Sequence, residues 1–489
     1  MELRELSAAV PGTQIAGDGD TEISDLAYDS RRAGPGTLFF CVPGHTADGH
    51  DFARQVVAAG AAALVVERPL GLGVPELRVA DARAAMAPLA AAFHRDPTSE
   101  LRVAGITGTN GKTTTAFLLR HILEAAGIRT GLLGTVKQVV GGAESEVGRT
   151  TPEAIDLQGT FRAMLGADDR ACVMEVSSHA LALGRTAGIR FEAGVFTNLT
   201  QDHLDFHDDM DDYFAAKRLL FEPTDGEPPR AAIVNADDAY GARLAGEIDC
   251  VTFSAAGAEA DYRAADVAFD AQGATFRCLA PGGEADVALP LPGHFNVENA
   301  LAAIAAAGAM GVEVAGAARA LATAARVPGR LEPVDEGQGF PVLVDYAHTP
   351  DSLDNVLRAA RRLTAERIVC VFGCGGDRDR AKRPLMGRIG AELADIAVVT
   401  SDNPRSEDPG AIIAEILAGI PGGADAERVV VEPDRRAAIR LALKRAGDGD
   451  VVVIAGKGHE QGQELADGET VPFDDVTVAR EALRGRLVI

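Results

Sequence analysis

The segment that most constrains the fold of this chain spans residues 105–115 and reads Gly-Ile-Thr-Gly-Thr-Asn-Gly-Lys-Thr-Thr-Thr. An apolar run precedes it and an amphipathic pattern at helical spacing follows it, so a buried strand is expected to lead through a glycine turn into a helix. Such a turn points several backbone N–H groups and the positive end of the helix at one place, which favours a bound phosphate. The segment therefore predicts an α/β domain with a nucleotide site.

Lys112 and Thr113 are the side chains of this segment that would act on a nucleotide. A lysine supplies a mobile positive charge for phosphate oxygens, and a threonine hydroxyl can bind Mg²⁺. The spacing departs from Gly-x-x-x-x-Gly-Lys-Thr, because Ile106 stands where that pattern has glycine and Gly105 comes one residue early. A plain strand-to-helix connection is the alternative. The strand before and the helix after favour a P-loop-like ATP site, with expected contacts from Gly108, Thr109, Asn110, Gly111, Lys112, Thr113 and Thr114.

Length and charge limit the class of protein. A chain of 489 residues is too long for one hydrophobic core, and about three domains are expected. The formal net charge of −25 argues against a general binder of nucleic acid or anionic membranes. No apolar stretch reaches about 18 residues and the N-terminal segment lacks the order of a signal peptide, which predicts a cytoplasmic protein without membrane insertion.

The six cysteines lie apart and mostly within apolar runs. Buried free thiols are therefore favoured over disulfides. Cys370 and Cys374 lack a second pair of cysteines or histidines at a suitable spacing, which argues against a metal site there.

Short apolar runs alternate with alanine- and leucine-rich helical segments along most of the chain, a pattern typical of parallel sheets covered by helices. A Pro-Gly break at 328–329 ends a long helical segment. The prediction is three α/β domains over 1–97, 98–327 and 328–489, the second with a mainly parallel sheet and the third Rossmann-like. Strands are expected at 37–42, 103–106, 172–176, 195–197, 342–344, 368–372, 396–399 and 451–454, with a helix at 82–94 capped by Asp81.

Polar residues follow several of these expected strands, where open α/β sheets bind their ligands. Glu175 closes one strand, and His203 lies in the polar segment after the next. Mg²⁺ prefers oxygen ligands and takes one or two carboxylates together with phosphate and water, so Glu175 is a natural metal ligand. The alternatives are a helix-capping carboxylate and an ordinary loop histidine.

The chain contains five motifs in order: Gly-Thr-Asn-Gly-Lys-Thr-Thr at 108–114, Met-Glu-Val-Ser-Ser-His-Ala-Leu at 174–181, Thr-Asn-Leu-Thr-Gln-Asp-His-Leu-Asp-Phe-His at 197–207, Gly-His-Phe-Asn-Val-Glu-Asn at 293–299 and Asp-Tyr-Ala-His-Thr-Pro at 345–350. Together they resemble the motifs of the ATP-dependent Mur ligases of peptidoglycan synthesis. The resemblance runs nearly end to end. It implies that a carboxylate of UDP-N-acetylmuramoyl-L-alanyl-D-glutamate attacks the γ-phosphate of ATP, and that an incoming amine then attacks the acyl phosphate. Neither step needs a protein nucleophile.

The resemblance also implies roles for single residues. Lys112, Glu175, His203 and Lys217 would be catalytic, with Lys217 carbamylated. Thr113, Glu175, His203 and the Lys217 carbamate would bind Mg²⁺. Without the resemblance, Lys217 would be taken for an exposed helix lysine. Asn296 and Asn299 would contact the adenine, although Asn296 is also a good helix cap, and Arg330 and Asp345 would close over ATP.

For the sugar nucleotide, the resemblance implies a UDP-binding first domain, and a muramoyl-dipeptide site on the second. The implied contacts are Tyr28, Ser30, His45, Thr46, Ala47, Thr150, Thr151, Ser177 and Arg185. On local sequence alone, the segments of the first domain are ordinary surface turns. Leu183 stands where some relatives have glutamine, so one contact is expected to be lost or replaced.

The incoming amine should bind to the last domain. The Asp-Asn-Pro-Arg sequence at 402–405 resembles the signature of members that add meso-diaminopimelate, whose second carboxylate an arginine would bind. Arg378 and Arg405 are expected to meet carboxylates, and Asn403, Gly456 and Glu460 the distal amine. The implied contacts are Arg378, Asp402, Asn403, Pro404, Arg405, Gly456 and Glu460. By local sequence alone, the segment is a turn with a solvated arginine.

Three alternatives remain at this stage: a lysine-adding member of the same family, a folylpolyglutamate synthase, and a nucleotide-binding regulator without catalysis. The arginine signature argues against the first, the muramoyl-site residues against the second, and Glu175, His203 and Lys217 against the third. The expected ligands are ATP, Mg²⁺, UDP-N-acetylmuramoyl-L-alanyl-D-glutamate and meso-diaminopimelate, bound by a monomer.

Overall fold

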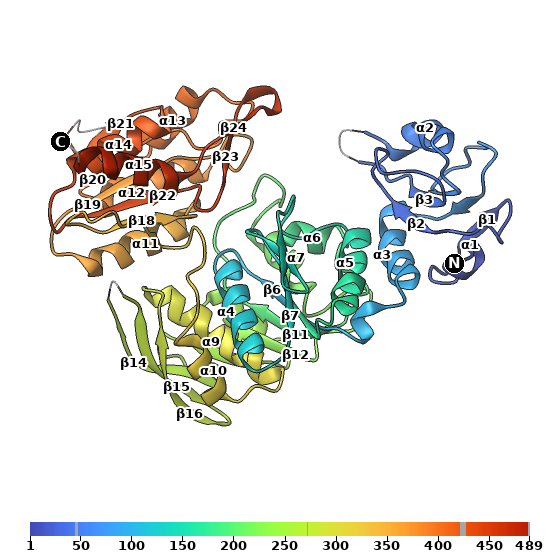
Figure 1. Ribbon diagram of the computed structural model, residues 1–489, viewed down its shortest axis with the longest axis horizontal. Helices are drawn as coiled ribbons and strands as arrows, with labels where there is room; N and C mark the ends of the chain where they lie inside the picture. Colours follow the sequence, from blue (N-terminus) through green and yellow to red (C-terminus); the bar gives the residue numbers. More distant parts are fainter. Residues whose placement is uncertain (45–46, 271, 421–426, 488–489) are drawn as a thin grey trace. The chain divides into compact units, whose positions relative to one another are not determined.

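The computed structural model describes residues 1–489 except 45–46, 271, 421–426 and 488–489. The chain forms two compact units. The first contains residues 1–107, 127–195 and 216–232, and the second contains residues 108–126, 196–215 and 233–489. Figure 1 gives the element labels used below.

The N-terminal part of the first unit is a five-stranded sheet in the order β1-β5-β4-β3-β2, parallel except for β1. Helix α3 packs on it through alanines, a methionine and a leucine, and Asp81 caps this helix by accepting a hydrogen bond from the Ala84 N–H at 2.9 Å, as predicted. The elements are α1 (Leu3–Ser7), β1 (Gln14–Ala16), β2 (Asp25–Ala27), β3 (Thr37–Phe40), η1 (Gly49–Phe52), α2 (Ala53–Ala58), β4 (Ala63–Val66), β5 (Glu76–Arg78), α3 (Ala82–Phe93) and η2 (Pro97–Ser99).

The second sheet of this unit has a parallel centre, in which β10 pairs with β6 on one side and β7 on the other. The expected strands at 103–106 and 172–176 are confirmed to within a residue. Two antiparallel strands, β8 and β9, extend this sheet and were not predicted. The elements are β6 (Arg102–Thr107), β7 (Thr130–Leu133), β8 (Gln138–Val140), β9 (Ala143–Ser145), α5 (Ala154–Gly166), β10 (Ala171–Glu175), α6 (Ser178–Ala182) and β11 (Phe191–Phe196).

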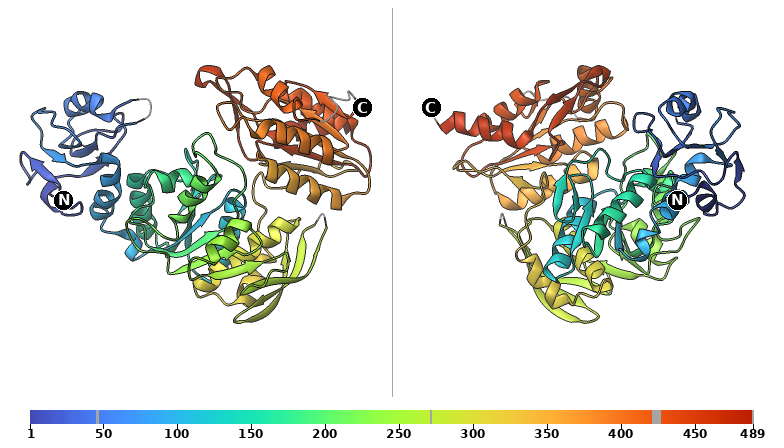
Figure 2. Two further views of the ribbon diagram at one scale, coloured as in Figure 1. Left: turned by 180° about the vertical axis from the view of Figure 1, so that it is seen from behind. Right: turned by 45° about the vertical axis from the view of Figure 1, so that its right-hand side comes forward.

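In the second unit, the helix that follows the glycine loop, α4, packs against the alanine-rich helix α9. Strands β14, β15 and β16 form an antiparallel ribbon that lies against α9 and α10, as both views of Figure 2 show in yellow-green. The sequence did not predict this ribbon. The elements are α4 (Lys112–Ala125), α7 (Met210–Arg218), β12 (Ala231–Asn235), α8 (Ala239–Ala245), β13 (Val251–Ser254), β14 (Tyr262–Phe269), β15 (Ala274–Ala280), β16 (Gly283–Leu289), α9 (His294–Ala309) and α10 (Val314–Leu321), of which α7 ends and β12 begins in residues of the first unit.

The C-terminal sheet is ordered β17-β18-β22-β19-β20-β21 and is parallel except for β17. Alternate residues of β19 enter two different cores, because Ile368 and Cys370 face α11 to α13 whereas Val369 and Val371 face α14 and α15. Burial on both faces explains why these strands are apolar throughout. The elements are β17 (Glu332–Pro333), β18 (Val342–Asp345), α11 (Pro350–Leu363), β19 (Ile368–Phe372), α12 (Lys382–Leu393), β20 (Ile396–Val399), α13 (Pro409–Leu417), β21 (Val429–Val431), α14 (Arg435–Arg445), β22 (Val451–Ala455), β23 (Gly462–Glu464), η3 (Ala466–Gly468), β24 (Thr470–Pro472) and α15 (Asp475–Leu487).

The predicted α/β class with mainly parallel sheets is therefore confirmed. All six cysteines are free thiols, as expected, and five are buried whereas Cys250 is half-buried. Within the part of the chain that the structure describes, no helix is both long and apolar enough to cross a bilayer.

Candidate active site

The glycine loop at the start of α4 has the backbone form that a phosphate cradle requires. Gly108 and Gly111 both have positive φ, at 146° and 87°, where only glycine fits without strain. Lys112 is the first residue of the helix, and its Nζ donates to the carbonyl oxygens of Gly108 and Thr109 at 2.8 and 2.9 Å. The loop therefore holds the lysine ammonium at the helix N-terminus, where anions bind.

Close packing also restricts position 111 to glycine, because a Cβ built on Gly111 would lie 2.3 Å from Asn299 Oδ1. We expect Gly111→Ala to lower the free energy of unfolding by at least about 2 kcal/mol, from the left-handed backbone and the clash together. Gly127→Ala is the matched control, since Gly127 has φ of 80° but nothing within 4 Å of its Cβ position, and should cost only about 1 kcal/mol. Equal losses of unfolding free energy in the two variants, measured by denaturant unfolding, would contradict the clash.

Asn299 and Asn296 form a chain of side-chain hydrogen bonds behind the loop. Thr115 Oγ1 donates to Asn299 Oδ1 at 3.4 Å, and Asn299 Nδ2 donates to Asn296 Oδ1 at 3.2 Å. Asn296 Nδ2 in turn donates to the Pro292 carbonyl at 2.7 Å. The alternative that Asn296 caps its helix is wrong, because the cap residue is Gly293 and both asparagines are buried within the helix.

Arg330 reaches the same loop from the segment that precedes β17. Its Nη2 donates to Thr113 Oγ1 at 3.0 Å, and its guanidinium lies over the Tyr346 ring at 4.8 Å from the centroid. Asp345 ends β18 and accepts a hydrogen bond from the Leu331 N–H at 2.7 Å. The structure thus brings together the predicted residues Thr113, Arg330 and Asp345 around one end of α4.

Asp345 is a buried carboxyl, and its burial raises its pKa from 3.8 to about 6, although the positive charge of Arg330 acts in the opposite direction. A carboxyl of this kind binds more protons in the folded than in the unfolded chain between these pH values, so its contribution to stability falls as the pH rises through that window. We expect the free energy of unfolding of Asp345→Asn to match that of the wild type near pH 4, and to exceed it by up to about 3 kcal/mol at pH 7. Denaturant unfolding at both pH values checks this; a pH-independent difference would contradict it.

A cavity of about 220 Å³ adjoins these residues. The glycine loop, the start of α9 and one face of α11 line this cavity. Phe269 and Arg362 also line it, and the Arg362 guanidinium lies over the Phe269 ring at 5.0 Å from the centroid. The lining combines two phenylalanines with several amides and three arginines, Arg330, Arg358 and Arg362, a mixture that suits an adenine nucleotide. Predicted ATP-site residues on the lining are Asn110, Gly111, Thr114, Asn299, Arg330 and Asp345.

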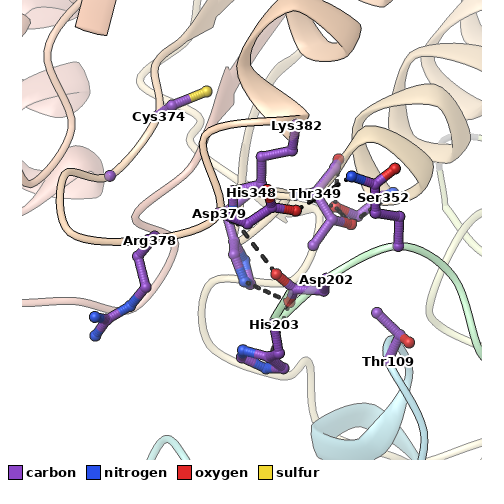
Figure 3. A network of polar contacts seen from close by, with 12 residues as sticks. Thr109, Asp202, His203, His348, Thr349, Ser352, Cys374, Arg378, Asp379 and Lys382 are labelled. Atoms are coloured by element: carbon purple, nitrogen blue, oxygen red, sulfur yellow. Dashed lines mark hydrogen bonds and ion pairs between the residues drawn. The ribbon is translucent and has the colours of Figure 1, made fainter. Parts of the chain in front are cut away.

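A cluster of charged residues surrounds Asp202, next to the predicted site residue His203 (Figure 3). Asp202 Oδ1 lies 3.5 Å from Lys382 Nζ, and its Oδ2 lies 3.5 Å from His203 Nε2 and 3.8 Å from His348 Nε2. Burial acts to raise the pKa of Asp202, but the neighbouring His203, Lys382 and His348 side chains outweigh it and hold the pKa well below its usual value. Arg378 points away from the cluster and is exposed.

Glu175 lies in the first unit and is almost fully buried. Its two carboxylate oxygens accept hydrogen bonds from Thr135, at 2.8 Å from the N–H and at 3.0 Å from the hydroxyl. Lys217 is 1% exposed, so the expectation of an exposed helix lysine is wrong. The acidic first turn of α7 suggests a solvent-exposed helix, and nothing in the sequence around Lys217 indicates its burial. Among the described residues, no group of three histidines, cysteines or carboxylates forms a metal cage.

The predicted muramoyl-dipeptide residues cluster around Thr151 in the first unit. Thr151 Oγ1 donates to the Glu175 carbonyl at 2.9 Å and accepts from the Ser177 N–H at 3.1 Å, and Arg185 Nη1 donates to the Thr151 carbonyl at 3.1 Å. Thr150 Oγ1 lies 3.1 Å from Thr135 Oγ1. The arrangement concentrates hydroxyls and one arginine at the end of β10.

Three arginines meet at Glu153, which the sequence did not single out. Arg149, Arg185 and Arg83 lie 2.7, 3.0 and 3.5 Å from its carboxylate. This carboxylate balances a local concentration of positive charge next to Thr151.

In the predicted UDP segments, Tyr28 Oη donates to Asp156 at 2.7 Å, and burial together with this carboxylate raises the tyrosine pKa. Ser30 is half-buried, and Ala47 is an exposed turn residue whose carbonyl accepts from the Gly44 N–H at 2.9 Å. His45 and Thr46 lie outside the described residues. Leu183, the departure from the family pattern, is half-buried at the end of α6.

The three loops predicted to bind the amine substrate converge in the second unit. Arg405 has φ of 51°, donates from Nη1 to the Gly376 carbonyl at 2.9 Å and from Nε to Glu464 at 2.5 Å. The alternative of a solvated turn is therefore wrong for this arginine. Asn403 Nδ2 donates to Glu460 at 2.9 Å. Gly456 has φ of 122°, and a Cβ on it would lie 2.4 Å from Asp402 Oδ2, so the loop needs glycine there.

Comparison with known proteins places this geometry in a family. The family models described as "Mur ligase family, catalytic domain", "Mur ligase middle domain" and "Mur ligase, glutamate ligase domain" match residues 22–94, 106–307 and 329–458. A curated relative from Geobacillus kaustophilus (strain HTA426) is 47% identical over 494 residues, which cover 99% of this chain and 100% of the relative. The chain belongs to the Mur ligase family.

That relative of this Mur ligase is called UDP-N-acetylmuramoyl-L-alanyl-D-glutamate--2,6-diaminopimelate ligase. A relative of the same name from Solibacter usitatus (strain Ellin6076) is 49% identical over 95% of this chain and 94% of its own length. A solved structure of a ligase with that name is 32% identical, with a TM-score of 0.68, and the match covers 100% of this chain and 99% of that chain.

Proposed function

We propose that this Mur ligase uses ATP to join meso-diaminopimelate to UDP-N-acetylmuramoyl-L-alanyl-D-glutamate. The observation that carries the proposal is the match over nearly the whole chain to relatives that bear this name. The arrangement of Lys112, Thr113, Arg330 and Asp345 beside one cavity supports the use of a nucleotide.

In the proposed reaction, an oxygen of the glutamyl carboxylate attacks the γ-phosphorus of ATP, the bond to the bridging oxygen breaks, and ADP leaves. The resulting acyl phosphate is attacked by an amine, which forms the amide, releases phosphate and gives up a proton. Lys112 and Arg330 would neutralise the phosphate charge that develops in the first step. Asn296 and Asn299 would hold the adenine edge, since an amide can both donate and accept.

Mg²⁺ would supply further positive charge for the phosphate oxygens when bound. The donor set fits this ion, because Mg²⁺ takes few protein ligands and prefers oxygen, and Glu175 offers a buried carboxylate. Thr113 and His203 would contribute in the second unit. Lys217 would need to be converted to a carbamate by CO₂, which replaces its positive charge with a negative charge carried by two oxygen ligands.

Recognition of the muramoyl dipeptide is assigned to Thr150, Thr151, Ser177 and Arg185, and that of UDP to Tyr28, Ser30, His45, Thr46 and Ala47. The diaminopimelate carboxylates would pair with Arg405 and Arg378, because an arginine fork binds a carboxylate through two parallel hydrogen bonds. Asp402, Pro404 and the Gly456 carbonyl would shape the pocket, and Glu460 would accept from the distal ammonium. The protein is proposed to act as a cytoplasmic monomer.

Phosphate release tests the proposal. The purified chain is incubated with ATP, Mg²⁺ and the UDP-muramoyl dipeptide, with meso-diaminopimelate, with L-lysine or without an amine. We expect sustained release only with meso-diaminopimelate. Release with lysine alone would favour the lysine-adding alternative, and release that depends on neither amine nor dipeptide would refute the proposal.

A further inference from the structure

Lys457 is a buried lysine for which neither the sequence motifs nor the proposed chemistry assigns a role. It follows β22 between Gly456 and Gly458, which have φ of 122° and 55°. Its side chain is 0% exposed, and a buried ammonium is stable only when it is paired and hydrogen-bonded. Its partners therefore indicate its purpose.

The Lys457 Nζ donates to Asn403 Oδ1 at 2.7 Å and to Glu460 Oε2 at 2.8 Å. Asn403 Oδ1 accepts a second hydrogen bond from the Glu464 N–H at 3.1 Å, which fills both of its lone pairs. The other end of the amide, Nδ2, donates to Glu460 Oε2 at 2.9 Å. Asn403 is thereby fixed with its oxygen toward Lys457 and its NH₂ group toward Glu460.

We infer that Lys457 is a positioning residue for the amine substrate, which sets Asn403 as a donor and Glu460 as an acceptor without touching the substrate itself. This inference rests on the proposed function, which assigns Asn403 and Glu460 to the distal end of meso-diaminopimelate. That end carries an ammonium and a carboxylate, which require an acceptor and a donor respectively. Glu460 remains 29% exposed, so its carboxylate is accessible while its Oε2 is held.

A purely structural role is less well supported, because another cation already holds this part of the fold. Arg435 donates from Nη2 to the Ala455 carbonyl at 3.0 Å, at the end of β22, and pairs with the buried Asp475 at 2.7 and 2.8 Å. The Gly456 N–H is bonded to the Asp345 carbonyl at 3.0 Å. The Lys457 ammonium instead donates to the two residues assigned to the substrate.

Steady-state kinetics of Lys457→Met test the inference. Methionine keeps most of the volume and removes both hydrogen bonds, so KM for meso-diaminopimelate should rise roughly ten- to a hundredfold, with a smaller change in kcat. KM for ATP and for the UDP-muramoyl dipeptide should change less than about twofold. Lys444→Met, at an exposed lysine in the last turn of α14, is the matched control and should leave all three KM values unchanged.

The same substitution in an Asn403→Ala background separates positioning from a general loss of structure. If Lys457 acts through Asn403, the two changes together should raise KM by much less than the product of their single effects. Multiplicative effects, or equal rises in all three KM values, would overturn the inference.

Lys457→Gln, whose shorter side chain keeps two N–H donors but carries no positive charge, is the second variant and should give an intermediate KM. An unchanged KM in either folded variant, or failure of both variants to fold, would overturn the inference. A wild-type chain without diaminopimelate-dependent phosphate release would instead refute the proposed function, and that result is seen before any variant is measured.

Discussion

Replacement of Lys112 by methionine is expected to lower kcat/KM by about a hundred- to a thousandfold, because loss of a single preorganised donor to developing charge commonly costs two to three orders of magnitude. The ammonium sits at the N-terminus of α4, and the carbonyls of Gly108 and Thr109 aim it. Methionine retains the apolar stem but carries no charge for the phosphate oxygens. Phosphate release under saturating dipeptide and diaminopimelate, at varied ATP, measures the loss.

The fold should survive this change. Lys112 donates two hydrogen bonds to loop carbonyls, and their removal should cost roughly 1–2 kcal/mol of unfolding free energy. Lys444→Met again serves as the control for loss of a lysine charge. A folded Lys112→Met chain with less than about a tenfold loss of kcat/KM would show that this lysine is not a phosphate ligand.

Arg405→Ala should have the second largest effect, on the choice of amine. Its guanidinium is held by the Gly376 carbonyl and by Glu464, so its position is set before a substrate arrives. Loss of a two-bond contact to the distal carboxylate should raise KM for meso-diaminopimelate about a hundredfold, and it should reduce the discrimination against lysine by a similar factor. Arg378→Ala is the matched comparison, because Arg378 is exposed and its replacement should raise KM for meso-diaminopimelate by a smaller factor.

Ratios of kcat/KM for the two amines, measured in the same preparation, check this prediction. Retention of the wild-type ratio in Arg405→Ala would remove the argument that a carboxylate–arginine pair sets the specificity. Because Arg405 has φ of 51°, alanine at this position experiences the same backbone strain as arginine, and a large loss of stability is not expected.

The glycine loop and the buried parallel strands could be predicted from the sequence because each is a local pattern. β19 is apolar throughout because Val369 and Cys370 enter different cores, and this continuous apolar run was recognised. The ribbon β14–β16 was missed because its buried or half-buried residues alternate with exposed ones, several of them charged, and so form no continuous apolar run like those of the buried strands.

Single side chains were harder to place. Lys217 lies on a helix whose first turn is acidic, and nothing in the local pattern indicates that the lysine is buried. Asparagine is a residue type that often caps helices, but Asn296 lies one turn inside its helix because Gly293, with φ of 99°, occupies the cap position. Lys382, which meets Asp202, and Asn403, which accepts from Lys457, come from segments far from their partners in the chain, so the folded structure is needed to show these contacts.

The most direct test of the account is a competition between two amines. The wild-type chain is supplied with ATP, Mg²⁺, UDP-N-acetylmuramoyl-L-alanyl-D-glutamate and equal concentrations of meso-diaminopimelate and L-lysine, and the mass of the UDP-linked product is measured. The account predicts a product extended by one diaminopimelate residue, with ADP and phosphate formed in equal amounts. A product extended by lysine, or ADP formed without an extended product, would contradict it.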